Sequence, residues 1–246
     1  MNNMNDMNHK NKQESQHLSP AISPAISPAP TTNKSQFRTL FKSQRDQQNQ
    51  ATQLKSAEQF CELFIQKFIQ TSLSHPALKN IQNIGIYLAQ TGELNLSPLI
   101  KILWSLNKNI YAPIIQNQHQ PYSKILKFGK YTEHTPCQPN AYFEKFGVQI
   151  LEPIKPLSFI SPAELDLVLC PLLAFDTQGN RLGTGGGYYD ATFNPIKNNK
   201  NNKLPYSKPY LLGCAFECQQ SNILIPKDPW DVKLEGVLTN QEFREF

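Results

Sequence analysis

Two short apolar segments on either side of an amphipathic segment constrain the fold of this chain most strongly. Residues 83–89 and 110–115 are apolar runs of strand length, and residues 96–106 between them have helical spacing, with Pro98 in the first turn. A strand–helix–strand unit is typical of a parallel sheet, because parallel neighbours need a crossover connection. Further apolar runs of strand type lie at 165–170, 210–216 and 237–239. The sequence therefore predicts an α/β protein with an open, mostly parallel sheet flanked by helices, in a Rossmann-like three-layer arrangement.

The first 33 residues differ in composition from the rest of the chain. They are rich in Asn, Gln, Ser and Pro and include a Ser-Pro-Ala-Ile repeat within residues 19–28. Such a segment cannot bury enough apolar surface to offset its ordering entropy, so we expect a disordered tail over 1–33 and an α/β domain over 34–246. The tail has no apolar run of signal-peptide or membrane-helix length and lacks arginine, so we expect a cytoplasmic protein without a membrane partner.

The net charge and the placement of the cysteines and histidines limit the functions that this chain can have. The net charge of +5 is mild and no nucleic-acid-binding motif accompanies it, so we expect no nucleic-acid partner. The five cysteines include no C-x-x-C pair, and the five histidines lie outside the motifs described below. We therefore expect reduced, mostly buried thiols rather than a zinc site or a histidine triad. We also expect a monomer.

The segment from residue 34 to about residue 70 has the pattern of a helix. Its apolar stripe consists of Ala57, Phe60, Cys61, Phe64, Ile65 and Phe68. Near its start, Lys34, Arg38 and Lys42 are four residues apart and share one face. Cations at a helix N-terminus gain nothing from the helix dipole, which favours an external anion such as a phosphate group; a solvated basic face is the simpler alternative.

Residues 181–190 read Arg-Leu-Gly-Thr-Gly-Gly-Gly-Tyr-Tyr-Asp. Four glycines in five positions allow main-chain N–H groups to approach a ligand closely, while Arg181 supplies a cation and Asp190 an oxygen ligand. The stretch matches neither the Walker pattern nor the G-x-G-x-x-G fingerprint. It nevertheless has what a polyphosphate site with a divalent cation requires.

Open parallel sheets bind ligands beyond the carboxyl ends of their strands. Glu93 follows one predicted strand, Asp176 and the glycine stretch follow another, and Asp231 precedes the last. We expect these positions to converge on one crevice.

Several stretches together resemble the 5-formyltetrahydrofolate cyclo-ligase family. The most specific match is residues 171–190, which contain the glycine stretch. Other matching pieces, in the same order and spacing, are residues 34–38, 87–94, 146–153 and 229–233. The resemblance covers residues 34–240 and excludes the tail and the Asn/Lys-rich part of loop 194–208.

The resemblance implies an ATP- and magnesium-dependent conversion of 5-formyltetrahydrofolate to 5,10-methenyltetrahydrofolate, with release of ADP and phosphate. It implies a phosphorylated formyl group, an imidate phosphate, as the intermediate. Because the nucleotide does the difficult chemistry, the protein would contribute positioning and charge neutralisation.

The same resemblance implies a role for particular residues. Lys34 and Arg181 are implied to be catalytic. Contacts with ATP are implied for Lys34, Arg38, Arg181, Leu182, Gly183, Thr184, Gly185, Gly186, Gly187, Tyr188 and Tyr189. Contacts with the folate are implied for Leu88, Glu93, Thr184, Gly185, Gly186, Gly187 and Tyr188. Asp190 and Asp231 are implied to supply oxygen ligands for magnesium, and Glu93 would accept a pair of hydrogen bonds from the pterin.

Some alternatives stay open from the residues alone. Glu93 also fits a solvated loop, Asp231 a turn, and Tyr188 with Tyr189 the packing of a helix start. We expect Trp104 and Trp230 to be packing residues. A non-catalytic regulator that binds a nucleotide on the same scaffold is the second hypothesis, and the presence of both Glu93 and Asp190 favours the enzyme.

Overall fold

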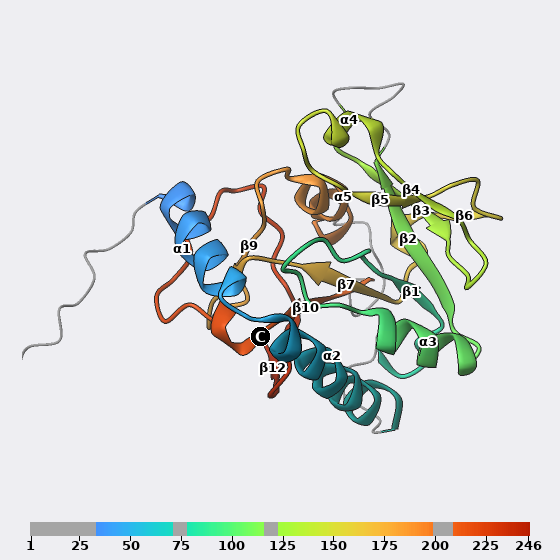
Figure 1. Ribbon diagram of the computed structural model, residues 1–246, viewed down its shortest axis with the longest axis horizontal. Helices are drawn as coiled ribbons and strands as arrows, with labels where there is room; N and C mark the ends of the chain where they lie inside the picture. Colours follow the sequence, from blue (N-terminus) through green and yellow to red (C-terminus); the bar gives the residue numbers. More distant parts are fainter. Residues whose placement is uncertain (1–32, 71–77, 116–122, 199–208) are drawn as a thin grey trace, which may run out of the picture. The chain divides into compact units, whose positions relative to one another are not determined.

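The computed structural model, drawn in Figure 1, describes residues 33–70, 78–115, 123–198 and 209–246. Thr31–Phe246 forms a unit of its own, and the description below concerns this unit. The predicted disordered tail lies outside the described residues except for Asn33, and so does most of the Asn/Lys-rich loop. The boundary between tail and domain stays a prediction.

An eight-stranded sheet forms the centre of this unit, in the order β12-β11-β10-β7-β1-β2-β3-β6. The five inner strands run parallel: β11 (Gly236–Thr239), β10 (Tyr210–Ala215), β7 (Leu167–Pro171), β1 (Asn83–Gly85) and β2 (Asn109–Ile115). The outer strands are antiparallel: β12 (Phe243–Glu245) at one edge, and β3 (Leu126–Lys130) with β6 (Phe159–Ile160) at the other. The predicted open, mostly parallel sheet is confirmed, whereas these antiparallel edges were not predicted.

The strand order contains one reversal, between β1 and β7. From β1 the chain moves outward to β2, then returns to the other side of β1 to form β7, β10 and β11. At this junction Ile84 pairs with Leu167 and Gly85 with Val168, so the segments that follow β1 and β7 leave the sheet side by side. In doubly wound sheets such a switch point is where ligands bind.

Successive residues of the central strands face opposite sides of the sheet. Leu167 and Leu169 belong to one core cluster, together with Phe64 and Leu103 from the helices on that side. Val168 and Cys170 belong to a second cluster on the other side, together with helical Phe193. Helices therefore cover both faces, as the three-layer prediction requires (Figure 1). They are α2 (Gln50–Phe64), continued by a π-helical segment Ile65–Gln70, and α3 (Ser97–Ser105) on one face, and α5 (Tyr188–Lys197) on the other.

The prediction of one continuous helix from residue 34 to about residue 70 is wrong at its middle. α1 (Lys34–Asp46) ends before α2 begins, and the Asn49 side chain caps α2 by accepting a hydrogen bond from Thr52 N at 2.9 Å. The two halves bury different partners. Phe37 and Phe41 of α1 pack with Ala174, Leu182 and Ile225, while α2 packs on the sheet. The chain must change direction between them.

Smaller elements surround the carboxyl ends of the strands. They are the hairpin of β8 (Ala174–Phe175) and β9 (Arg181–Leu182), the pair β4 (Cys137–Pro139) and β5 (Leu151–Pro153) with α4 (Ala141–Glu144), and the 3-10 turns Pro162–Glu164 and Glu217–Gln219. Buried Glu152 joins the β4–β5 pair to the end of β2, because its carboxylate accepts from Ile115 N and Asn140 Nδ2.

Two further expectations can be checked against the described residues. All five cysteines are free, and Cys61, Cys170 and Cys214 are buried, as expected for reduced structural thiols. None of the helices in the described ranges has both the length and the apolar character needed to cross a bilayer.

Candidate active site

The β8–β9 hairpin carries the chain from β7 to the glycine stretch. Phe175 pairs with Arg181, and the turn between the strands is closed by Asp176, which is fully buried. Its carboxylate accepts hydrogen bonds from Asn180 N, Asn180 Nδ2, Gln178 N and Ile225 N. The expectation that Asp176 faces the crevice is therefore wrong, since its oxygens bond to the turn and to Ile225 N of a distant segment.

The glycine stretch lies open to solvent at the start of α5. Thr184, Gly185 and Gly186 are exposed, and Gly187 is the N-cap of α5 in the left-handed region, with φ of 73° and no side-chain cap. A Cβ on Gly186 would lie 2.8 Å from the Tyr188 ring. Exposed main chain leading into a helix N-terminus is suited to an anion. Leu182 differs from its neighbours because its side chain is buried against α1, so only its main chain can face a ligand.

Helix α1 approaches the glycine stretch through Arg38. The Arg38 Nε donates to Gly183 O at 3.0 Å, and a Cβ on Gly185 would lie 3.6 Å from the guanidinium carbon. Lys34, one turn earlier, lies against Asp228 and Asp231, with its Nζ 2.6 Å and 2.5 Å from their Oδ2 atoms. Burial alone would lower the pKa of Lys34, but the two carboxylates outweigh it and raise the pKa, so the ammonium stays charged. Lys42, predicted on the same face, pairs with Asp46 instead.

Arg181 is almost enclosed by its neighbours. Its Nη2 donates to Asp190 Oδ1 at 3.0 Å, and its guanidinium lies 5.3 Å from the centre of the Tyr189 ring. Its Nε has no hydrogen-bond partner among the described residues, and the same holds for the buried Tyr189 hydroxyl. Asp190 Oδ1 also accepts from Val232 N, which brings the two predicted metal ligands, Asp190 and Asp231, onto adjacent segments.

Each of these carboxylates is already paired with a cation, Asp190 with Arg181 and Asp231 with Lys34. Within the described ranges, no group of three or more His, Cys, Asp or Glu side chains is placed to enclose a metal ion. A closed protein cage for a metal is therefore not formed by these residues. Magnesium commonly binds through one or two carboxylates plus phosphate oxygens and water, and a site of that open kind fits Asp190 and Asp231.

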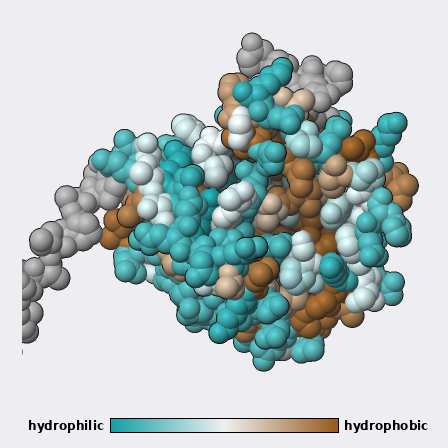
Figure 2. Space-filling model, in the orientation of Figure 1, coloured by the Kyte–Doolittle hydropathy of each residue, from teal (hydrophilic) through white to brown (hydrophobic). Residues whose placement is uncertain are grey.

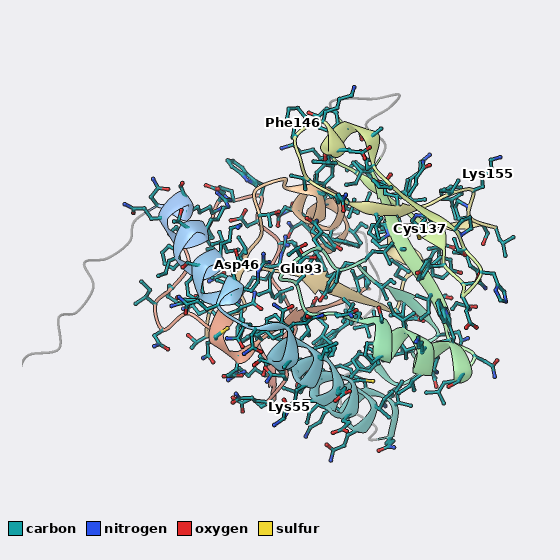
Figure 3. The ribbon with its side chains drawn as sticks, in the orientation of Figure 1. Asp46, Lys55, Glu93, Cys137, Phe146 and Lys155 are labelled. Carbon is teal, nitrogen blue, oxygen red and sulfur yellow. The ribbon has the colours of Figure 1, made fainter. Side chains whose placement is uncertain are left out.

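A cavity of about 670 Å³ opens beside the segment that follows β1. Its wall combines Tyr87, Leu88, Trp104 and Tyr131 with charged groups that include the carboxylate of Glu93. Glu133 and Lys101 also line it. Figure 2 shows apolar residues gathered on this face over β2 and α3, and Figure 3 places Glu93 near its centre. Trp104, expected to be a packing residue, thus also borders the cavity; its ring N–H donates to Tyr131 O.

Glu93 is held by its own loop. Its Oε2 accepts from Gln90 N at 2.9 Å, while the Tyr87 hydroxyl donates to Leu94 O at 2.7 Å and fixes the end of the loop. Burial raises the pKa of Glu93, with the Gln90 N–H and the charge of Arg45 acting in the opposite direction. A solvated loop residue would not experience this desolvation, so the alternative of Glu93 as a solvated loop residue is disfavoured.

Sequence reasoning missed three charged residues near these groups. Asp228 shares Lys34 with Asp231. Lys124 extends over the N-cap of α5, where its Nζ would lie 3.7 Å from a Cβ on Gly187. Arg45 lies beneath the Glu93 loop. An isolated lysine before a strand and an arginine within a basic helix carry no motif, so only the fold reveals their positions.

The fold and these groups define a doubly wound α/β protein with a glycine-rich helix N-terminus on one side of its switch point and a cavity that contains the half-buried carboxylate of Glu93 on the other. A sequence profile described as the 5-formyltetrahydrofolate cyclo-ligase family matches residues 30–240. The chain belongs to this family.

Individual relatives of the chain agree with this family assignment. The chain is 37% identical over 175 residues to a 5-formyltetrahydrofolate cyclo-ligase of Haemophilus influenzae, covering 70% of this chain and 83% of the relative. It is 30% identical over 176 residues to one of Escherichia coli, covering 71% and 86%. Its fold is similar to an Aquifex aeolicus 5,10-methenyltetrahydrofolate synthetase, with a TM-score of 0.65 at 22% identity over 86% of this chain and 92% of that one.

Proposed function

We propose that the chain converts 5-formyltetrahydrofolate to 5,10-methenyltetrahydrofolate, using ATP and magnesium and releasing ADP and phosphate. Family membership supports cyclo-ligase activity, and curated relatives bear that name. The observation that carries the proposal is the arrangement at the switch point. The segment after β1 lines the cavity that contains Glu93, and the segment after β7 leads to the exposed glycine stretch. Because β1 and β7 are neighbours, this arrangement suits two ligands that must react with each other.

The nucleotide half would be formed by α1 and the start of α5. Main-chain N–H groups of 183–187 would cradle the phosphates, and Lys34, Arg38 and Arg181 would neutralise their charge. Lys34 and Arg181 are held by carboxylates before a nucleotide is present. A triphosphate would replace Asp231 and Asp190 as the partner of these cations, and both carboxylates would become available as metal ligands. Asp190 and Asp231 would hold magnesium, which would reduce the negative charge that opposes attack on the γ-phosphate.

The folate half would be the cavity. Leu88 and the aromatic wall would enclose the ring system, and ionised Glu93 would accept a pair of hydrogen bonds from the pterin amino group and ring N–H. Gly185 and Tyr188 are proposed to contact both ligands, although neither residue lines the cavity itself. This placement would hold the formyl oxygen beside the terminal phosphate.

The chemical difficulty is that a formamide oxygen is a poor leaving group. In the proposed reaction this oxygen attacks the γ-phosphorus, the bond to the bridging oxygen breaks, and ADP departs. N10 then attacks the activated formyl carbon and gives up its proton, and the oxygen leaves as phosphate. The protein residues supply orientation and charge complementarity during both steps.

The product absorbs in the near ultraviolet, which provides the test. Purified protein should form it only when ATP, magnesium and 5-formyltetrahydrofolate are all present. Arg181→Ala should abolish product formation. Absence of the absorbance with the complete mixture, although calorimetry shows nucleotide binding, would favour a non-catalytic nucleotide-binding protein instead.

A further inference from the structure

Arg45, in the last turn of α1, is a buried cation whose hydrogen-bonding needs are not met. It is 5% exposed, and neither its Nε nor its Nη1 has a hydrogen-bond partner among the described residues. Its neighbouring carboxylate oxygen, Asp46 Oδ1, lies 3.5 Å from Nε, and the other oxygen of Asp46 is bonded by Lys42 at 2.9 Å. Burying such a group lowers stability, so its position calls for a physical reason.

The guanidinium of Arg45 lies directly beneath the loop that follows β1. A Cβ on Gly92 would be 3.0 Å from Asp46 Oδ1, 3.1 Å from Arg45 Nε and 3.2 Å from Arg45 Nη2, and Gly92 has φ of +83°. The main chain at Gly92 therefore packs on the Arg45 guanidinium and the Asp46 carboxylate paired with it, and the position accepts only a residue without a side chain. Figure 3 shows the end of α1, marked by Asp46, next to Glu93.

This loop is the one that carries Glu93. Gly92 directly precedes Glu93, whose carboxylate accepts a hydrogen bond from Gln90 N. The contacts beneath Gly92 therefore help to fix the conformation of the turn that carries Glu93. The positive charge of Arg45 also acts against the burial that raises the pKa of Glu93. Arg45 therefore acts on the Glu93 carboxylate in two ways, through the position of its loop and through its charge.

Arg45 shares its helix with the cations of the nucleotide half. Arg45 follows Arg38 by seven positions, about two helical turns, so both side chains leave the same side of α1. Arg38 bonds the glycine stretch and Arg45 supports the Glu93 loop. One helix thus contacts both halves of the proposed site.

We propose that Arg45 is a positioning residue for the folate half of the site, which holds the Glu93 loop in its binding geometry. The proposal rests on the proposed cyclo-ligase function. It explains why an incompletely bonded guanidinium is kept at this place, since functional sites often retain groups that reduce stability.

The test compares Arg45→Met and Arg45→Lys with Lys55→Met, a matched control at an exposed lysine of α2. The readouts are KM for each substrate, the calorimetric Kd for 5-formyltetrahydrofolate, and the melting temperature. Arg45→Met should raise folate KM and Kd about tenfold or more, because small displacements at a site have large effects. ATP KM should change less than about twofold. The melting temperature should stay or rise, since a buried, poorly paired charge is replaced by an apolar chain of similar length. Arg45→Lys should recover part of the folate affinity, and Lys55→Met should match the unmodified protein.

The opposite pattern would overturn the proposal. A lower melting temperature of Arg45→Met with unchanged folate KM and Kd would make Arg45 an ordinary structural residue. Equal increases in both KM values would mean that α1 as a whole has moved. Failure of the proposed function itself looks different, because the unmodified protein would then produce no product. The folate Kd still tests Arg45 in that case, and unmodified protein that also binds no folate overturns both proposals.

Discussion

The Lys34 ammonium lies 2.5 Å from Asp231 Oδ2, across 197 positions of sequence. This ion pair joins the first helix to the segment that precedes β11. It also pairs a proposed phosphate contact with a proposed metal ligand. In our account the pair holds the site together until nucleotide and magnesium replace it.

Asp231→Asn and Asp228→Asn test this exchange, because both carboxylates bond Lys34 but only Asp231 is proposed to bind magnesium. Asp231→Asn should raise the magnesium concentration for half-maximal activity about tenfold, through loss of an anionic ligand. Asp228→Asn should leave that concentration unchanged. The stability of either variant should change by less than about 1 kcal/mol, since Lys34 keeps one carboxylate and both pairs are partly exposed. Equal magnesium dependence in the two variants would contradict the assignment.

Gly187→Ala and Gly147→Ala separate backbone strain from ligand binding. Both glycines have φ of 73°, and a Cβ on Gly147 would meet nothing within 4 Å. Each substitution should reduce the free energy of unfolding by about 1 kcal/mol through the left-handed conformation. Only Gly187→Ala should also lower kcat/KM for ATP, by about tenfold or more, because its main chain caps the proposed phosphate-binding helix. Thermal unfolding and steady-state kinetics measure both effects, and unchanged ATP kinetics in Gly187→Ala would count against the site.

The pH dependence of folate binding tests the state of Glu93. Because burial raises the pKa of this carboxyl, protonation begins at a higher pH than for an exposed glutamate. The protonated form cannot accept both hydrogen bonds, so folate KM should rise as pH falls through the raised pKa. Glu93→Gln should have a high KM that lacks this pH dependence. An identical pH profile in the variant and the unmodified protein would exclude the role.

The pH dependence of folding stability due to Glu93 should be opposite to that of folate binding. Its pKa is higher in the folded than in the unfolded state, so its contribution to the free energy of unfolding is greatest at acid pH. That contribution is lost as pH rises through the folded-state pKa. Denaturant unfolding of Glu93→Gln and the unmodified protein across this range should show the variant gaining relative stability as pH rises.

The core of the fold was predictable because buried strands and helices leave a recognisable pattern of apolar residues in the sequence. Alternating burial of Leu167, Val168, Leu169 and Cys170 toward two helical layers requires a fully apolar strand, which the sequence shows directly. The edge strands β6 and β12 were missed because they are short and partly exposed; Phe159 of β6 is 58% exposed. The break between α1 and α2 depends on which surface each helix packs against, and only the capping residue Asn49 signals it.

The candidate site was predictable where a motif exists and not elsewhere. The glycine stretch and Glu93 stand out by composition or by resemblance, and the structure brings them to neighbouring strand ends. Asp176 follows a strand just as Glu93 does, yet its oxygens bond to its own turn and to Ile225 N. Arg45 lies in a basic helix like many solvated arginines, so its burial depends on a loop 47 residues away at Gly92.

The most direct measurement follows the oxygen that must leave. With 5-formyltetrahydrofolate carrying heavy oxygen in its formyl group, our account predicts that one labelled oxygen appears in each phosphate released, with one ADP formed per methenyl product. Mass spectrometry of the phosphate reads this outcome. Unlabelled phosphate, or label recovered in water, would show that the formyl oxygen is not transferred to the terminal phosphate of ATP and would contradict the account.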